Sequence, residues 1–159
     1  MPYEKVNIQF LKTHPDAVLP TKAHNEDNCF DLYAVEDTQI FCSRSAVVPV
    51  GLTVAYITPG FGFVIRPRSG LGFKYGLQPH LGEIDNGYRG DLSVKVYNFS
   101  SWNIIETGTM GSRSNFYQVK KGDRIAQIKV EKVWDTDVSF VDEIVPATRG
   151  EKGFGSSGK

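Results

Sequence analysis

Short stretches in which apolar and polar residues alternate run along most of this chain. Three of them are Val6, Ile8 and Phe10; Leu52, Val54 and Tyr56; and Leu92, Val94 and Val96. Successive side chains of a β-strand point to opposite faces, so this period of two predicts strands with one buried face. Turn-like segments such as "TPGFG" (58–62), "NGYRG" (86–90) and "KKGD" (120–123) separate further strand candidates. Many short strands in 159 residues predict one all-β domain, a sandwich or barrel.

Helical signals are weak in this sequence. The best one covers about two turns after Ser69 in "RSGLGFKYG" (68–76), with Ser69 as the expected N-cap. The stretch "FSSWNIIETGTMGSRSN" (99–115) is long and polar for a connection between strands, so we expect an extended loop there, within one domain of residues 1–148. The final stretch, "RGEKGFGSSGK" (149–159), is too rich in glycine to hold a fold alone. We predict that it is a flexible C-terminal lid.

Composition excludes several classes of function. Eighteen Lys and Arg balance 18 Asp and Glu, so we expect no broad cationic surface for nucleic acid or membranes. No apolar run reaches the length of a membrane span, and "MPYEKVNIQF" lacks the apolar core of a secretory signal, so we expect a cytoplasmic protein, or one in the host cytoplasm or nucleus if the gene is viral. Cys29 and Cys42 are expected to be reduced thiols, and the histidines lack metal-ligand spacing.

Five segments carry the residues with chemical potential: "FDLYA" (30–34), "RPRSGLG" (66–72), "LGEIDNGYRGD" (81–91), "GDRIAQI" (122–128) and the tail. Each has an ordinary interpretation alone, such as a strand, a turn or a hairpin whose Asn-Gly supplies positive φ. Together and in this order they resemble the five motifs of the trimeric dUTP diphosphatases (dUTPases). The resemblance implies a β-barrel or jelly roll, and a homotrimer whose active sites lie between subunits and borrow the tail of a third.

The resemblance also implies a reaction. Water would attack the α-phosphorus of dUTP and release dUMP and diphosphate, which keeps uracil out of DNA and supplies dUMP for thymidylate synthesis. The residue that matches the catalytic aspartate is Asp85, which would position and activate the water. A carboxylate can accept the proton without a covalent intermediate, which fits a chain without a Ser-His or Cys-His nucleophile signature. Tyr88 would pack beneath the deoxyribose and exclude a 2′-hydroxyl.

Uracil recognition would come largely from backbone groups. The resemblance gives this role to a hairpin from Gln78 to Gly82, which includes Pro79, with help from the strand near Ser93. A narrow pocket of backbone groups would reject larger or methylated bases. The sequence departs from many relatives here, since Gly87 stands where they have an acidic residue and Pro79 where some have a base-reading side chain.

The triphosphate needs fixed donors. Arg68, the Ser69 hydroxyl and the backbone at Gly70 would supply them at the start of the expected helix. Gln127 would be a neutral donor to a phosphate or to the attacking water. Two alternatives stay open, because Arg68 could instead brace the sheet and Gln127 could be a buried structural amide.

Magnesium is implied because clustered phosphate oxygens need charge neutralisation, and Mg²⁺ keeps most of its waters when it binds through substrate phosphates. The resemblance points to Asp31 as a carboxylate that contacts the ion through water; the alternative is a solvated strand residue.

The tail has a matching set of roles in the resemblance. Arg149 would meet the γ-phosphate, Phe154 would stack over uracil, and Gly155, Ser156 and Ser157 would bind terminal phosphate oxygens. Closure would then exclude bulk water. The alternative interpretation of "GSSG" is a flexible linker.

Two rival functions remain. In dCTP deaminases, which share the fold, a glutamate stands where "LSVKV" (92–96) has Lys95, and a lysine cannot perform the same proton relay. The second rival is an interaction protein that uses the 99–115 loop as its contact surface, since aromatic, aliphatic and Arg side chains anchor interfaces. The candidate anchors in the loop are Trp102, Ile104, Ile105 and Arg113. A loop that folds back on its own trimer is the alternative.

Overall fold

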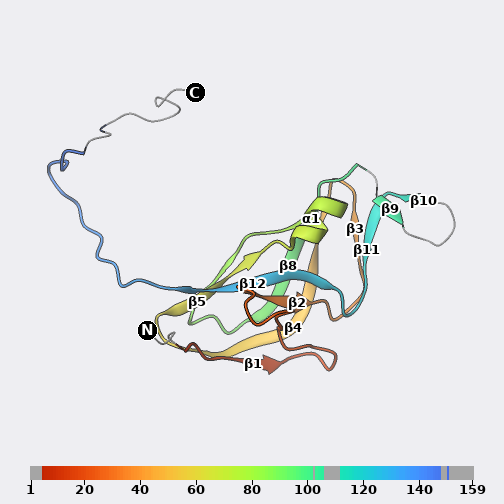
Figure 1. Cartoon of the computed structure of the whole chain (residues 1–159), viewed down its shortest axis with the longest axis horizontal. Coiled ribbons are helices and arrows are strands. Elements are labelled where there is room, and N and C mark those ends of the chain that lie inside the picture. Colours follow the sequence, from red (N-terminus) through yellow and green to blue (C-terminus); the bar gives the residue numbers. More distant parts are fainter. Residues whose placement is uncertain (1–4, 102, 106–111, 148–149, 151–159) are drawn as a thin grey trace.

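The structure is a computed structural model that describes residues 5–101, 103–105, 112–147 and 150. Two four-stranded antiparallel sheets pack against each other (Figure 1). The first has the order β1-β4-β8-β6, with β1 (Ile8–Lys12), β4 (Ser45–Ile57), β8 (Asp91–Asn98) and β6 (Leu77–Pro79). The second has the order β2-β12-β5-β7, with β2 (Cys29–Tyr33), β12 (Arg124–Lys132), β5 (Phe61–Arg66) and β7 (Glu83–Ile84).

Smaller elements complete the fold. Strand β3 (Thr38–Phe41) pairs with β11 (Phe116–Val119), and β9 (Asn103–Ile105) pairs with β10 (Ser112–Ser114). Helix α1 (Ser69–Tyr75) is short and lies between β5 and β6 in the chain. The prediction of an all-β fold with little helix is confirmed.

The core forms where the inward faces of the two sheets meet. On β8, Leu92, Val94 and Val96 are buried while their neighbours in the strand point outward, as the alternation predicted. The rings of Phe10 on β1 and Phe63 on β5 lie 6.3 Å apart and join the two sheets. The apolar positions of the strands therefore close one continuous core.

The alternation fails at the end of β4. The sequence predicted Tyr56 on the buried face with Val54, but Tyr56 is 41% exposed and Ile57 is buried. Phe10 pairs with Val54 and Gln9 pairs with Tyr56, so Ala55 is an extra residue opposite β1. Such a β-bulge shifts the following residues to the opposite face of the sheet, which explains why Ile57 takes the core position.

The start of α1 differs by one residue from the prediction. Ser69 is the first helical residue, while Arg68 is the N-cap, with an extended backbone and no side-chain capping bond. The prediction of Ser69 as N-cap was therefore wrong. The helix ends at Gly76, whose φ of 67° lies in the left-handed region and whose N–H donates to the carbonyl of Gly72.

Two segments extend beyond the sheets. The β9–β10 pair projects from one end of the molecule, and residues 133–147 lead away from the other end without a helix or strand (Figure 1). Along this arm, Val138, Phe140 and Ile144 are each at least 90% exposed. In the described ranges, no helix has the length and apolar character needed to span a membrane.

Candidate active site

The carboxylate of Asp31 is the centre of a cluster of charged side chains. Asp31 lies on β2 and is only 9% exposed. Its Oδ1 accepts a hydrogen bond from Arg68 Nε at 2.8 Å, and its Oδ2 accepts one from Arg124 Nη1 at 3.2 Å. Arg68 Nη1 also donates to the backbone carbonyl of Arg124 at 3.2 Å. Two cations therefore share one buried carboxylate, and a positive charge remains.

Gln127 fixes the segment that leads into α1. It lies on β12 between Asp31 of β2 and Arg66 of β5 in the sheet register. Its Nε2 donates to the carbonyl of Pro67 at 2.7 Å, and Pro67 directly precedes Arg68. The side chain is half-buried and makes this one structural contact, while its second N–H and its carbonyl oxygen have further bonding capacity.

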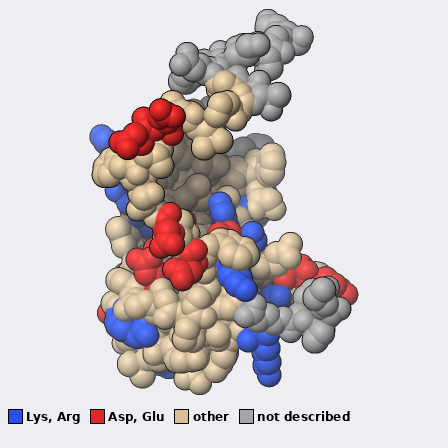
Figure 2. All heavy atoms as spheres, turned by 90° about the vertical axis from the view of Figure 1, so that its left-hand side faces the viewer, with Lys and Arg blue, Asp and Glu red and all other residues tan. Residues whose placement is uncertain are grey.

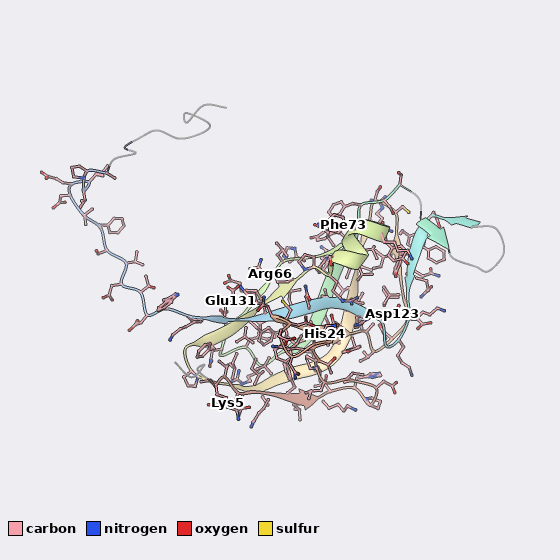
Figure 3. The ribbon with its side chains drawn as sticks, viewed as in Figure 1. Lys5, His24, Arg66, Phe73, Asp123 and Glu131 are labelled. Carbon is pink, nitrogen blue, oxygen red and sulfur yellow. The ribbon has the colours of Figure 1, made fainter. Side chains whose placement is uncertain are left out.

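Two neighbouring cavities open around this cluster. Arg68, Ser69 and Gln127 line both of them, and Asp31 and Gly70 line the first, which has a volume of about 350 Å³. The second has a volume of about 390 Å³ and includes Phe73, which is 95% exposed on α1 (Figure 3). The structure therefore brings together the predicted residues of the first, second and fourth segments.

Arg124 and Asp27 belong to this site but were missed by the sequence interpretation. Both line the first cavity. Arg124 stands three positions before Gln127, and strict alternation would put them on opposite faces of β12. A register shift between Arg124 and Ala126 inserts an extra residue, so Ile125 and Ala126 are both buried and Arg124 shares the face of Gln127.

The third segment forms a tight turn between β7 and β8. The backbone N–H of Tyr88 donates to the carbonyl of Asp85 at 3.0 Å, and Tyr88 Oη donates to the carbonyl of Asp91 at 3.2 Å. The ring of Tyr88 lies over Gly90, where an added Cβ would be 2.6 Å from Tyr88 Cζ. Only glycine fits at position 90 while the tyrosine ring stays in this place.

Asn86 anchors this turn to the body of the protein. Its Nδ2 lies within hydrogen-bond distance of three carbonyl oxygens, those of Ile57 at 3.2 Å, Thr58 at 3.0 Å and Phe61 at 2.9 Å. Asp85 and Tyr88 are exposed on either side of this anchor. The turn therefore presents both side chains from a fixed backbone.

Asp85 lies apart from the Asp31 cluster. It lines a cavity of about 220 Å³ with Glu83, Glu131 and Lys132. Glu131 also bonds Lys129 at 3.2 Å and Arg66 at 3.4 Å, the latter across β12 and β5 (Figure 3). The hydrogen bonds from Lys129 and Arg66 hold the pKa of Glu131 below its usual value. One chain alone thus does not bring Asp85 into the cavities that Arg68 lines.

The segment from Gln78 to Gly82 is not the hairpin that the sequence predicted. Pro79 is buried and pairs with Val96 of β8 in the first sheet, whereas the carbonyl of Gly82 accepts a bond from Ile65 of the second sheet at 2.8 Å. The segment is a crossing between the sheets, because β6 and β7 belong to different sheets. Ser93 points outward on β8, opposite Pro49 of β4.

Cys29 is a further lining residue of the first cavity. Desolvation by burial raises the pKa of its thiol, and the nearby cations Lys129 and Arg66 only partly oppose this effect. A raised pKa keeps the sulfur protonated near neutral pH, so Cys29 is a poor nucleophile. Neither Cys29 nor Cys42 takes part in a disulfide bond within the described residues.

Within the part of the chain that the structure describes, no group of three or more His, Cys, Asp or Glu residues could form a metal centre. Both oxygens of Asp31 already accept guanidinium N–H groups, so contact through a water molecule fits this carboxylate better than direct coordination.

Charges on the visible face are mixed. Acidic and basic side chains lie next to each other over the middle of the body in Figure 2. This face therefore carries charges of both signs side by side.

The predicted tail residues lie outside the described residues: Arg149, Phe154, Gly155, Ser156 and Ser157. Trp102 of the 99–115 loop also lies outside the described residues.

Comparisons with known proteins agree with the fold. The family model for dUTPase matches residues 16–158. The chain is 38% identical to a deoxyuridine 5′-triphosphate nucleotidohydrolase of Solibacter usitatus, with 98% of each chain covered. It is 35% identical to the enzyme of that name from Solanum lycopersicum, over 98% of this chain and 85% of the relative. The solved structure of Staphylococcus bacteriophage 80alpha dUTPase with dUPNHPP superposes with a TM-score of 0.84 at 27% identity, over 96% of this chain and 99% of that one. A match of this extent, on a jelly-roll scaffold that carries the motifs in order, means that the chain belongs to the dUTPase family.

Proposed function

We infer that the protein is a dUTP diphosphatase, which hydrolyses dUTP to dUMP and diphosphate with the help of Mg²⁺. The observation that carries this proposal is the cluster of Asp31, Arg68 and Arg124 beside the cavities that Ser69 and Gln127 line, on a chain of the dUTPase family. The cluster offers guanidinium donors that are already fixed by Asp31, which suit a triphosphate.

Arg68, Ser69 and Gly70 bind the phosphates in this proposal. Arg68 is held by Asp31 through Nε and by the Arg124 carbonyl through Nη1, and the N–H groups that are left serve the ligand. Ser69 and Gly70 are exposed at the cavity and add a hydroxyl and a backbone N–H. Donors that are already fixed need no reorganisation when the charge of the transition state develops.

Asp85 is the general base in this proposal. It holds the attacking water and accepts its proton while the water adds to the α-phosphorus and diphosphate leaves. Gln127 orients the phosphate or the water with its second N–H. Proton transfer to a carboxylate is compatible with the exposed position of Asp85 on its anchored turn.

Tyr88 and the backbone around it select the nucleoside. Tyr88 packs beneath the deoxyribose and leaves no room for a 2′-hydroxyl, and the backbone near Pro79, Gly82 and Ser93 reads uracil. The ring of Tyr88 is held in place for this role, because its Oη donates to the carbonyl of Asp91 and the ring packs closely over Gly90.

Magnesium would be held by the phosphates of dUTP and, through water, by Asp31. When bound, it neutralises phosphate oxygens and makes the α-phosphorus easier to attack.

The proposed assembly is a homotrimer with three shared sites. It is supported by the separation of Asp85 from the cavities of Arg68, since each proposed site needs both groups. The exposed apolar side chains of Val138, Phe140 and Ile144 on the arm support association as well. Arg149, Phe154, Gly155, Ser156 and Ser157 then close over the nucleotide, with Arg149 on the γ-phosphate and Phe154 on uracil.

The 99–115 loop is proposed as a contact surface for another protein. The projection of the β9–β10 pair from the body favours this role (Figure 1). The proposal places the enzyme in the cytoplasm, or in the cytoplasm or nucleus of a host cell if the gene is viral.

Product analysis tests the function. Purified protein with MgCl₂ is incubated separately with dUTP, dCTP, dTTP and UTP, and products are separated by ion-exchange chromatography. We expect dUMP and diphosphate from dUTP alone, with oxygen-18 from labelled water in dUMP. Label in diphosphate would contradict attack at the α-phosphorus, and equal turnover of UTP would contradict the role of Tyr88.

A further inference from the structure

Arg124 completes a closed ring of hydrogen bonds around the proposed phosphate site. Arg68 Nε donates to Asp31, Asp31 accepts from Arg124 Nη1, and the backbone carbonyl of Arg124 accepts from Arg68 Nη1. Each of the three residues therefore contacts the other two. We propose that Arg124 is a positioning residue, which holds Asp31 and Arg68 in the arrangement that binds phosphate; this inference rests on the proposed function.

Strand β12 ties the phosphate-binding segment at two points. Gln127 holds the carbonyl of Pro67 at 2.7 Å, and Arg124 holds Arg68 both directly and through Asp31. The bulge between Arg124 and Ala126 makes this possible, because it turns Arg124 to the same face as Gln127. The strand thus fixes the backbone before α1 and the side chain at its N-cap.

Arg68 is more buried than Arg124, so its side chain is the more constrained of the two. The side chain of Arg68 is 24% exposed, that of Arg124 is 46% exposed, and that of Asp31 is 12% exposed. Without Arg124, Oδ2 of Asp31 loses its guanidinium donor in a largely dehydrated place. The carboxylate can then rotate to pair both of its oxygens with Arg68, which draws N–H groups of Arg68 away from the cavity.

This role differs from a direct contact between Arg124 and the ligand. A positioning residue acts through Arg68, so its removal has little further effect once Arg68 is gone. If Arg124 instead binds phosphate by itself, its removal weakens binding by the same factor whether Arg68 is present or absent. A double-mutant cycle separates the two, because residues that act through each other give non-additive effects.

The experiment measures binding of inorganic triphosphate by calorimetry, with EDTA and with MgCl₂. Variants are Arg124→Met, which keeps the apolar stem, Arg68→Met, and the double variant. Lys121→Met is the matched control, since it removes a surface ion pair to Asp16 of 3.1 Å between side chains that are 56% and 47% exposed. Each variant is also assayed for KM and kcat with dUTP, and its oligomeric mass is measured.

We expect Arg124→Met to weaken triphosphate binding by about tenfold, as for the loss of a charge-assisted hydrogen bond. KM for dUTP rises with it, the oligomeric mass stays as in the parent, and Lys121→Met binds like the parent. The double variant should bind within about twofold of Arg68→Met alone. Additive losses, or parental binding by Arg124→Met, would overturn the positioning role.

Arg124→Lys gives a second test that does not depend on the folding of the methionine variant. Lysine keeps the charge near the cavity but is a point donor without the guanidinium fork. Positioning predicts a loss of more than about threefold that again disappears in the Arg68→Met background. Parental binding by Arg124→Lys would overturn the inference, while a parent protein that neither binds triphosphate nor hydrolyses dUTP would overturn the proposed function itself.

Discussion

The turn that presents Asp85 depends on one side chain, that of Asn86. Its Nδ2 lies 2.9 to 3.2 Å from three backbone carbonyl oxygens of the β4–β5 connection and its flanks. Replacement of Asn86 by alanine removes the donor and leaves these carbonyls to find water. Replacement by aspartate keeps the shape but puts an acceptor against the three oxygens.

The magnitude follows from the number of bonds. An amide nitrogen has two hydrogens, so at most two of the three contacts of Asn86 are full hydrogen bonds. With about 0.5–1.5 kcal/mol net for each bond, Asn86→Ala should lower the free energy of unfolding by about 1–3 kcal/mol. Asn86→Asp should lower it more, because its charge meets three carbonyl dipoles. Misplacement of Asp85 should reduce kcat by about ten- to a hundredfold.

Urea unfolding followed by circular dichroism, at one fixed protein concentration, measures the stability, and dUTP turnover measures the placement of Asp85. Asn115→Ala and Asn115→Asp are matched controls, because Asn115 is exposed. Among the hydrogen bonds of the described residues, Asn115 takes part only through its backbone carbonyl, which accepts from the N–H of Cys42. If Asn86→Asp were as stable and as active as Asn115→Asp, the turn would not depend on this anchor.

Three further outcomes are expected. Asp85→Asn should retain binding of a non-hydrolysable dUTP analogue and lose about a hundredfold or more in kcat, and parental turnover would remove Asp85 from the mechanism. Deletion of residues 149–159 should reduce dUTP turnover strongly, while the number of chains per assembly, measured by light scattering, stays as in the parent. Dissociation of the assembly would instead mean that the tail holds the subunits together. In a Cys42→Ser background, iodoacetamide should modify Cys29 more slowly in the folded protein than in urea at pH 8, because burial raises the pKa of the folded thiol above its ordinary value and leaves less thiolate. Equal rates in both states would contradict that ordering, and the folded rate should rise as the pH passes the raised pKa.

Much of the architecture could be predicted from the alternation of apolar and polar residues. The inward positions of β8 followed it, and the motif order was enough to group Asp31, Arg68 and Gln127. Alternation fails where a strand gains a residue, because a bulge exchanges the two faces from that point on. This is why the sequence misplaced Tyr56, and why it gave no role to Arg124.

Connections between sheets are the second limit of the sequence. The segment from Gln78 to Gly82 has the glycine and proline of a turn, yet it carries the chain from β6 to β7, in different sheets. Local turn chemistry does not distinguish a hairpin from a crossing, since both need a change of direction. The partner strand decides, and that partner is distant in the sequence, as for Pro79 and Val96.

The distance between Asp85 and Arg68 within one chain has a genetic consequence. If each site combines the carboxylate of one subunit with the arginine of another, then two differently damaged copies of the gene can compensate for each other. Chains that carry Asp85→Asn and chains that carry Arg68→Met would be inactive alone. Their co-expression would produce mixed assemblies in which some active sites combine an intact Asp85 with an intact Arg68. A cell with both alleles would therefore recover part of the activity that neither allele gives alone.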